Sequence, residues 1–228
     1  MVLIFLSLGN KGGSNVPVRV ACVGDSNTED SRYPSELQSK LGTSYFVRNF
    51  GVSGATVMAQ SGNPYANLDA FQDAKKFLPE IVVIMLGTND ARLSALPFLG
   101  NFAAEYKNLI SEFQGLTSKP EILLIKPPPI FANHLGLNNT ILMQDVIPRI
   151  EQVANEPGLI TIDVYAALIN HPEYFLDGVH PNSKGAEVIA MEVNNGINLI
   201  NSTKAIAMKT TQAVCNRNPT EIILRKQL

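Results

Sequence analysis

Short apolar segments alternate with helical patterns along most of this chain, and this alternation restricts the possible folds more than any other feature. Strand-like apolar runs occupy residues 16–24, 45–51, 78–87, 119–129 and 158–165. Helical patterns occupy residues 33–42, 101–116, 140–156 and 183–200. Strands that are apolar on both sides must be covered on both faces, and intervening helices can supply that cover. We therefore expect an α/β fold, a three-layer αβα sandwich around a five-stranded parallel sheet.

Glycine and proline mark where these elements begin and end. Gly42 closes the helical pattern 33–42, and Pro34 lies near its start, where a proline is tolerated. Three consecutive prolines, 127–129, stop the fourth strand because proline cannot continue a hydrogen-bonded ladder. Pro148 predicts a kink inside the helix 140–156.

The chain has 228 residues, enough to bury a sizeable core, and no repeat or flexible linker divides it. We expect a single domain over residues 1–228, with a core at about 17–200 and a short extension at each end. The apolar run at residues 1–8 is far shorter than the roughly 20 residues of a membrane-spanning helix, and no clear secretory signal surrounds it. We expect it to pack on the body, and "EIILRK" (221–226) to add a short strand or helical turn.

Composition excludes several classes of partner. The net charge of −2 gives no electrostatic reason to expect nucleic acid or an anionic membrane as a partner. Two cysteines, Cys22 and Cys215, and three histidines form no disulfide framework and no spaced metal site, so we expect no structural zinc. The composition is that of a soluble protein. It leaves the oligomeric state open, and both a cytoplasmic and a secreted location.

Four polar stretches follow the predicted strands: "GDSN" (24–27), "NFGVSG" (49–54), "GTND" (87–90) and, after a further helical pattern, "LDGVHPN" (176–182). Each by itself is typical of a turn or a helix cap. In a parallel sheet, however, the carboxyl ends of the strands meet at one edge, and ligands bind there. The four stretches together therefore predict a site built from all of them.

A serine and a histidine in these stretches suggest nucleophilic catalysis. A serine hydroxyl becomes a useful nucleophile when a base takes its proton, and histidine suits that task because it ordinarily titrates near pH 6.5. Of the three histidines, His180 alone has a carboxylate, Asp177, three residues earlier. One loop can then present acid and base together, with Ser26 supplied from elsewhere.

Other residues remain as alternatives. His134 and His171 are interpreted as a loop and a helix-end histidine. Asp163 and Asp145 are rival carboxylates, but neither has the short local link to His180.

The four stretches resemble the blocks of the SGNH hydrolases, also called GDSL-type esterases, over residues 17–200. The resemblance implies a flavodoxin-like fold and an ester hydrolase without metal or cofactor. It places the nucleophile on Ser26, the base on His180 and the acid on Asp177. Asn27 stands where the family motif has leucine, a position without a chemical role.

The same resemblance implies three donors for the oxyanion of the tetrahedral intermediate. These are the backbone N–H groups of Ser26 and Gly54 and the side-chain amide of Asn89. Asp25 and Asp90 are expected to bond nearby backbone and hold the loops in place.

The substrate is predicted from the loops that would wall the site, at residues 29–34, 58–68, 91–102 and 126–139. Their polar amides and aromatic rings suit a sugar, and the sequence looks most like the carbohydrate O-acetylesterases of the family. The expected substrate contacts are Arg32, Tyr33, Tyr65, Arg92 and Phe131. The expected partner is a small-molecule or oligosaccharide ester. The alternatives are a broad short-chain acyl esterase, a lysophospholipase- or thioesterase-like enzyme, and a non-catalytic carbohydrate-binding protein.

Overall fold

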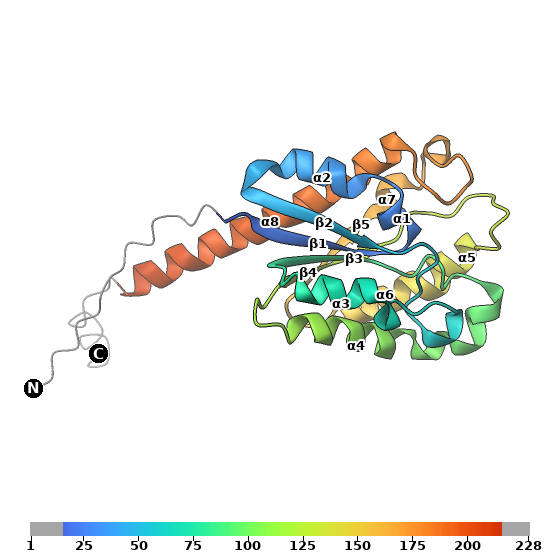
Figure 1. Cartoon of the computed structure of the whole chain (residues 1–228), viewed down its shortest axis with the longest axis horizontal. Helices are drawn as coiled ribbons and strands as arrows, with labels where there is room; N and C mark the ends of the chain where they lie inside the picture. The colour runs from blue at the N-terminus through green and yellow to red at the C-terminus, as the bar shows by residue number, and fades with distance from the viewer. Residues whose placement is uncertain (1–15, 216–228) are drawn as a thin grey trace, which may run out of the picture.

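A five-stranded parallel sheet forms the centre of the protein (Figure 1). The structure is a computed structural model that describes residues 16–215, with side chains as far as residue 210. The strands are β1 (Val18–Gly24), β2 (Tyr45–Gly51), β3 (Ile81–Met85), β4 (Glu121–Lys126) and β5 (Leu159–Asp163). Their order across the sheet is β2-β1-β3-β4-β5, which is the flavodoxin-like order. The predicted fold class is confirmed.

Helices cover both faces of this sheet. They are α1 (Ser26–Glu29), α2 (Tyr33–Leu41), α3 (Asp69–Lys76), α4 (Phe102–Gln114), α5 (Asn139–Ile141), α6 (Ile147–Ala154), α7 (Val164–Leu168) and α8 (Ser183–Cys215). Figure 1 shows α2, α7 and α8 on one face and α3, α4 and α6 on the other. The apolar pattern of the sequence does not predict α3, because its eight residues are mostly polar.

Alternate residues of the central strands build two separate cores. In β1, Val20 and Cys22 are buried against α2 and α8, whereas Ala21 and Val23 are buried in the layer of α3, α4 and α6. All four side chains are fully buried, as expected of a strand covered on both sides. Burying one valine side chain contributes roughly 1.5–3 kcal/mol, so these strands hold the sheet rigid beneath its polar carboxyl edge.

The last predicted strand differs from the expectation of a core strand. β5 lies at the edge of the sheet, and its Thr161 and Asp163 are exposed while Leu159 and Ile160 are half-buried. An edge strand has a neighbour on one side alone, so its apolar run is covered less completely than those of β1 and β3. Its position in the sheet, rather than its composition, decides this.

The predicted helix at residues 140–156 is interrupted before Pro148 rather than kinked at it. Leu142–Val146 form a π-helical turn between α5 and α6, and Pro148 is the second residue of α6. Proline has no N–H to donate to the carbonyl four residues earlier, and its ring would collide with that carbonyl. The wider π turn moves that carbonyl away and lets the helix continue.

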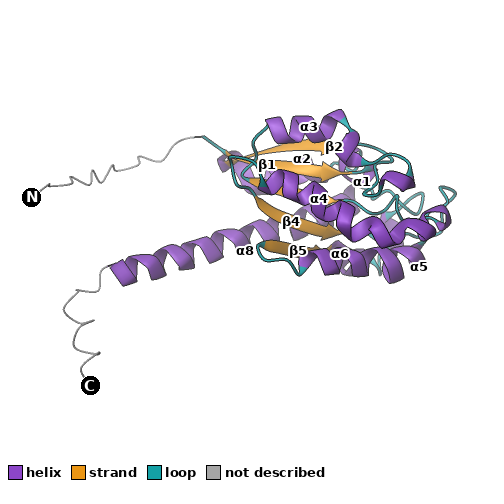
Figure 2. Ribbon diagram, turned by 90° about the horizontal axis from the view of Figure 1, so that it is seen from below, coloured by secondary structure: helices purple, strands orange, loops and turns teal. Residues whose placement is uncertain are grey.

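The closing helix α8 continues well past the predicted end at residue 200. Its burial ends with Ile200, and residues 201–210 are exposed. Lys204 pairs with Glu121 at 2.9 Å, and Asn201 donates to the Tyr45 hydroxyl at 2.8 Å. Figure 2 shows this end of α8 extending beyond the sheet. Within residues 16–215, no helix is both long and apolar enough to cross a membrane. The expected N-terminal packing and the element at 221–226 lie outside the described residues.

Candidate active site

Ser26 lies at the carboxyl edge of the sheet, as the first residue of α1 and two residues after β1 ends. Asp25 is the N-cap of this short helix, and its carboxylate accepts from the Asn27 N–H at 2.9 Å. The N–H groups of Thr28 and Glu29 donate to the Asp25 carbonyl, whereas the Ser26 N–H bonds to no other described residue and remains a donor beside the serine hydroxyl. The capping role considered for such a sequence therefore belongs to Asp25, and Ser26 faces the site.

His180 and Asp177 come from one tight loop, as their spacing predicts. Asp177 Oδ1 accepts from the backbone N–H groups of Val179, at 2.9 Å, and His180, at 2.8 Å. Gly178 between them has φ of +82°, and a Cβ atom there would collide with the Ala132 carbonyl. A side chain at this position would be strained in both respects, so glycine shapes the loop.

The three side chains form one hydrogen-bonded chain. Ser26 Oγ lies 2.9 Å from His180 Nε2, and His180 Nδ1 lies 2.5 Å from Asp177 Oδ2. With its proton on Nδ1, His180 donates to Asp177 and accepts from the serine hydroxyl. Desolvation raises the pKa of Asp177, but the hydrogen bonds from His180 and Val179 outweigh it and lower the pKa to about 2. Asp177 is therefore an anion beside the imidazole.

Two further hydrogen-bond donors line the same pocket as Ser26. Gly54 has φ of +76°, with open space where a Cβ would lie, and its N–H bonds to no other described residue. Asn89 donates one side-chain hydrogen to the Ala55 carbonyl, at 3.1 Å, which leaves the second hydrogen free to reach a ligand. Gly54, Asn89 and Ser26 all line one pocket.

Asp90 holds the segment that carries Gly54. Its carboxylate accepts from the N–H groups of Val57, at 2.8 Å, and Met58, at 3.0 Å. Burial raises the pKa of Asp90 to about 6, and these two hydrogen bonds lower it in part. The role expected for Asp90, a bond to nearby backbone, is what its contacts show.

Asp25 is fully buried beneath the serine. Its Oδ2 is buried without a hydrogen-bond partner among the described residues. Desolvation raises the pKa of Asp25 to about 7, and the Asn27 N–H opposes that rise. The neutral acid is thus stable in this position over most of the acidic range.

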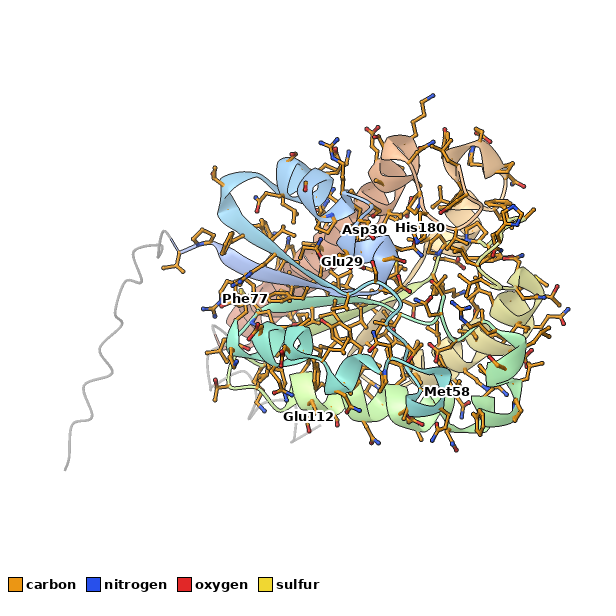
Figure 3. The ribbon with its side chains drawn as sticks, turned by 45° about the vertical axis from the view of Figure 1, so that its right-hand side comes forward. Glu29, Asp30, Met58, Phe77, Glu112 and His180 are labelled. Carbon is orange, nitrogen blue, oxygen red and sulfur yellow. The ribbon has the colours of Figure 1, made fainter. Side chains whose placement is uncertain are left out.

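The pocket around Ser26 has a volume of about 290 Å³. Three of the four expected loops contribute to it, through Asp30, Arg92, Leu135 and Leu137. Figure 3 shows Asp30 and His180 beside one another at this end of the molecule. The fourth loop, residues 58–68, lines a different cavity next to α3 and α4, which corrects the expectation that it walls the site.

Of the five expected substrate contacts, the structure places Arg92 in the pocket. Tyr33 and Tyr65 are instead fully buried in the two cores, and the Tyr65 hydroxyl donates to the Phe50 carbonyl at 2.6 Å. Arg32 is exposed at the start of α2, outside the pocket lining.

Phe131, the fifth of these residues, packs on Phe175 with 5.1 Å between ring centroids. Its N–H donates to the Gly178 carbonyl at 2.7 Å. Phe131 therefore supports the loop of His180 rather than facing a ligand. Ser53 and Val179 line the pocket and were not expected from the sequence, although each adjoins a predicted site residue.

The rival carboxylates are occupied elsewhere. Asp163 pairs with Lys126 at 2.8 Å and caps α7, and Asp145 lies 3.5 Å from Arg149. His171 lies 3.0 Å from Glu173, in the turn that follows α7. Within the described part of the chain, no group of three or more His, Cys, Asp and Glu side chains is placed to hold a metal ion.

Comparison with known proteins identifies the family. The model of the GDSL-like lipase/acylhydrolase family matches residues 22–188. An acetylxylan esterase of Xylanibacter ruminicola is 34% identical over 199 residues, which are 76% of this chain and 42% of that protein. A multidomain esterase of Ruminococcus flavefaciens is 25% identical over 190 residues, 79% of this chain and 23% of that protein. The chain thus spans less than half the length of either relative.

A solved structure of an acetyl xylan esterase has the same fold. It matches with a TM-score of 0.65 at 21% identity, covering 79% of this chain and 100% of that one. The resemblance seen in the four sequence blocks is therefore confirmed by the family match and by the fold. This chain belongs to the GDSL-like lipase/acylhydrolase family, a family of carboxylic ester hydrolases.

Proposed function

We propose that this chain removes O-acetyl groups from carbohydrates, with Ser26 as nucleophile, His180 as base and Asp177 as the acid that orients the base. We also propose that residues 1–228 act as one catalytic domain. The observation that carries the proposal is the chain of contacts from Ser26 Oγ through His180, at 2.9 and 2.5 Å, which opens into the pocket.

The reaction begins at Ser26. As its Oγ attacks the acetyl carbonyl carbon, the hydroxyl proton passes to His180 Nε2. Asp177, held anionic by its hydrogen bonds, stabilises the imidazolium that forms. The short contact between His180 Nδ1 and Asp177 also keeps the ring in the orientation that Ser26 requires.

The attack moves negative charge onto the former carbonyl oxygen. The N–H groups of Ser26 and Gly54 and the free hydrogen of the Asn89 amide are proposed to bind this oxyanion. They are held before the substrate arrives, because Asp90 fixes the segment after Gly54 and Ala55 fixes the Asn89 amide. Preorganised donors of this kind act most strongly in a site shielded from water.

Two bond cleavages complete the cycle. The tetrahedral intermediate expels the sugar oxygen, which takes the proton from His180, and leaves an acetyl ester on Ser26. Water then attacks that ester, gives its proton to His180, and releases acetate as the proton returns to Ser26 Oγ.

The pocket supports a small acyl group on a polar alcohol. Its volume of about 290 Å³ lies at the lower end of the range for ligand pockets, so a long acyl chain would have to extend beyond it. Arg92 donates to the Leu135 carbonyl at 2.7 Å, and its other N–H groups can reach hydroxyl groups of a sugar. The names of the two similar acetylxylan esterases support the same substrate class.

The test is acetate release from acetylated xylan, compared with hydrolysis of p-nitrophenyl esters from acetate to octanoate. We expect activity on acetylated xylan and, among the synthetic esters, a preference for acetate. Ser26→Ala should lower both activities by at least about 10⁴-fold, because it removes the nucleophile. The matched control is Ser35→Ala, which truncates an exposed serine of α2 and should leave both unchanged.

Two results would count against the proposal. Activity retained by Ser26→Ala would exclude Ser26 as nucleophile. Octanoate hydrolysed faster than acetate, without acetate release from xylan, would favour the broader acyl esterase instead.

A further inference from the structure

A second cavity lies away from Ser26. It has a volume of about 480 Å³ and is lined by α3, α4 and the segment 57–67, and we call it the α3–α4 groove. Figure 3 shows Glu112 of this groove on α4, well apart from His180. Its floor is apolar and buried, made by Val57, Phe71 and Leu109.

The charged side chains of the groove are already engaged. Lys75 pairs with Glu112 at 3.0 Å, and its Nζ lies 4.5 Å from the centroid of the Phe71 ring. Glu105 accepts from the Ala59 N–H at 2.8 Å. Binding an ion would require breaking one of these contacts, so the groove is poorly suited to a charged ligand.

Three carboxamides in the groove, by contrast, are free. Asn67, Gln72 and Asn108 line it, are exposed, and make no side-chain hydrogen bond to any described residue. A carboxamide offers both an acceptor oxygen and two donor hydrogens, which is the combination that a hydroxyl group can satisfy in either direction. Several such groups beside small apolar side chains match a ligand with many hydroxyl groups and no charge.

The groove and the Ser26 pocket share one backbone segment. Gly54 lines the pocket and Val57 lines the groove, and three residues of extended chain span at most about 11 Å. The Val57 N–H also donates to Asp90, which follows Asn89 of the pocket. The groove and the pocket are thus connected through one firmly held backbone segment.

We propose that the α3–α4 groove is a second binding site, for a neutral oligosaccharide. Asn67, Gln72 and Asn108 bind its hydroxyl groups, while the accessible apolar side chains of Ala59, Pro64 and Ala66 contact the less polar face of the sugar rings. The site binds unmodified sugar and performs no chemistry, so the proposal does not depend on hydrolysis at Ser26.

The test is titration calorimetry of the whole chain with xylohexaose, which carries no ester. We expect binding, and the double variant Gln72→Ala/Asn108→Ala should raise Kd about tenfold through the loss of two hydrogen bonds. The control Gln152→Ala/Asn195→Ala removes two exposed amides from α6 and α8, outside the groove, and should leave Kd unchanged. Thermal unfolding of each variant verifies that it is folded.

A single variant tests the groove independently, in case the double variant does not fold. Asn108→Asp keeps the shape and the acceptor but loses the donor and adds a negative charge, and it should also raise Kd. An unchanged Kd in both groove variants would overturn the proposal, as would absence of binding at millimolar xylohexaose. Tighter binding of trigalacturonate than of xylohexaose would overturn the assignment to a neutral ligand. Binding of xylohexaose without acetate release from acetylated xylan would support the groove proposal and contradict the proposed deacetylation.

Discussion

Asp25 makes the stability of this protein fall as pH rises, opposite to the effect of an aspartate whose pKa is lowered by an ion pair. Its carboxyl is fully buried, and desolvation raises its pKa from 3.8 to about 7. An unfolded chain loses this proton near pH 4, whereas the folded chain keeps it until about pH 7. Because the folded state binds the extra proton between these values, the free energy of unfolding falls as pH rises through this range.

The size of the effect follows from the displacement of the pKa. Since one unit of pKa corresponds to about 1.36 kcal/mol, the rise to about 7 amounts to roughly 4 kcal/mol in total. About 3 kcal/mol of this falls between pH 4 and pH 7. Asp25→Asn removes the titration but keeps an oxygen that can accept from the Asn27 N–H, as Asp25 does at 2.9 Å.

The assay is urea unfolding of the wild type and Asp25→Asn at several pH values from 4 to 7. We expect the stability of the variant to increase relative to the wild type by about 3 kcal/mol over that range. Asp69→Asn, at an exposed position in the first turn of α3, is the control and should track the wild type closely. If the Asp25→Asn and wild-type curves remain parallel, the buried carboxyl does not hold its proton and the reasoning fails.

Two further substitutions separate catalytic geometry from stability. Asn89→Ala removes a proposed oxyanion donor and should lower kcat for p-nitrophenyl acetate about 100- to 1000-fold, measured by steady-state kinetics; a loss below tenfold would exclude that role. Tyr65→Phe removes the hydroxyl that donates to the Phe50 carbonyl, and should lower the free energy of unfolding by about 1 kcal/mol in urea unfolding. Because Tyr65 is buried away from the pocket, kcat should stay the same. A strong loss of activity would indicate that Tyr65 does contact the substrate.

The alternation of apolar runs and helical patterns was sufficient to predict the sheet. The positions of such elements depend on local chemistry, because a β-branched run favours a strand and a terminal glycine ends a helix within a few residues. Gly42, for example, directly follows the last residue of α2, as predicted. The interruption before Pro148 was recognised as a proline effect, but its π-helical form depends on how the carbonyl of the preceding turn is accommodated.

The stretches that surround Ser26 were predicted from their places at strand ends, and the resemblance to the SGNH hydrolases pointed to Gly54 and Asn89 within them. Parallel strands bring those ends to one edge, so Ser26, Gly54, Asn89 and the loop of His180 were expected to meet there. In the structure they line one pocket. The catalytic roles given to them remain proposals, which the Ser26→Ala and Asn89→Ala experiments address.

Composition could not predict that the two tyrosines are buried or that the loop 58–68 lies outside the Ser26 pocket. A tyrosine can face a ligand or fill a core, and the layers of helices that bury Tyr33 and Tyr65 come from distant parts of the chain. In the same way, loop 58–68 lines the α3–α4 groove because α3 and α4 lie beside it, an arrangement with no local signal. The sequence by itself determined the elements and the residues at the strand ends, since these depend on local hydrogen bonding and on parallel pairing. Burial depends on which surfaces meet in three dimensions, so the tertiary structure decided which side chains face a ligand.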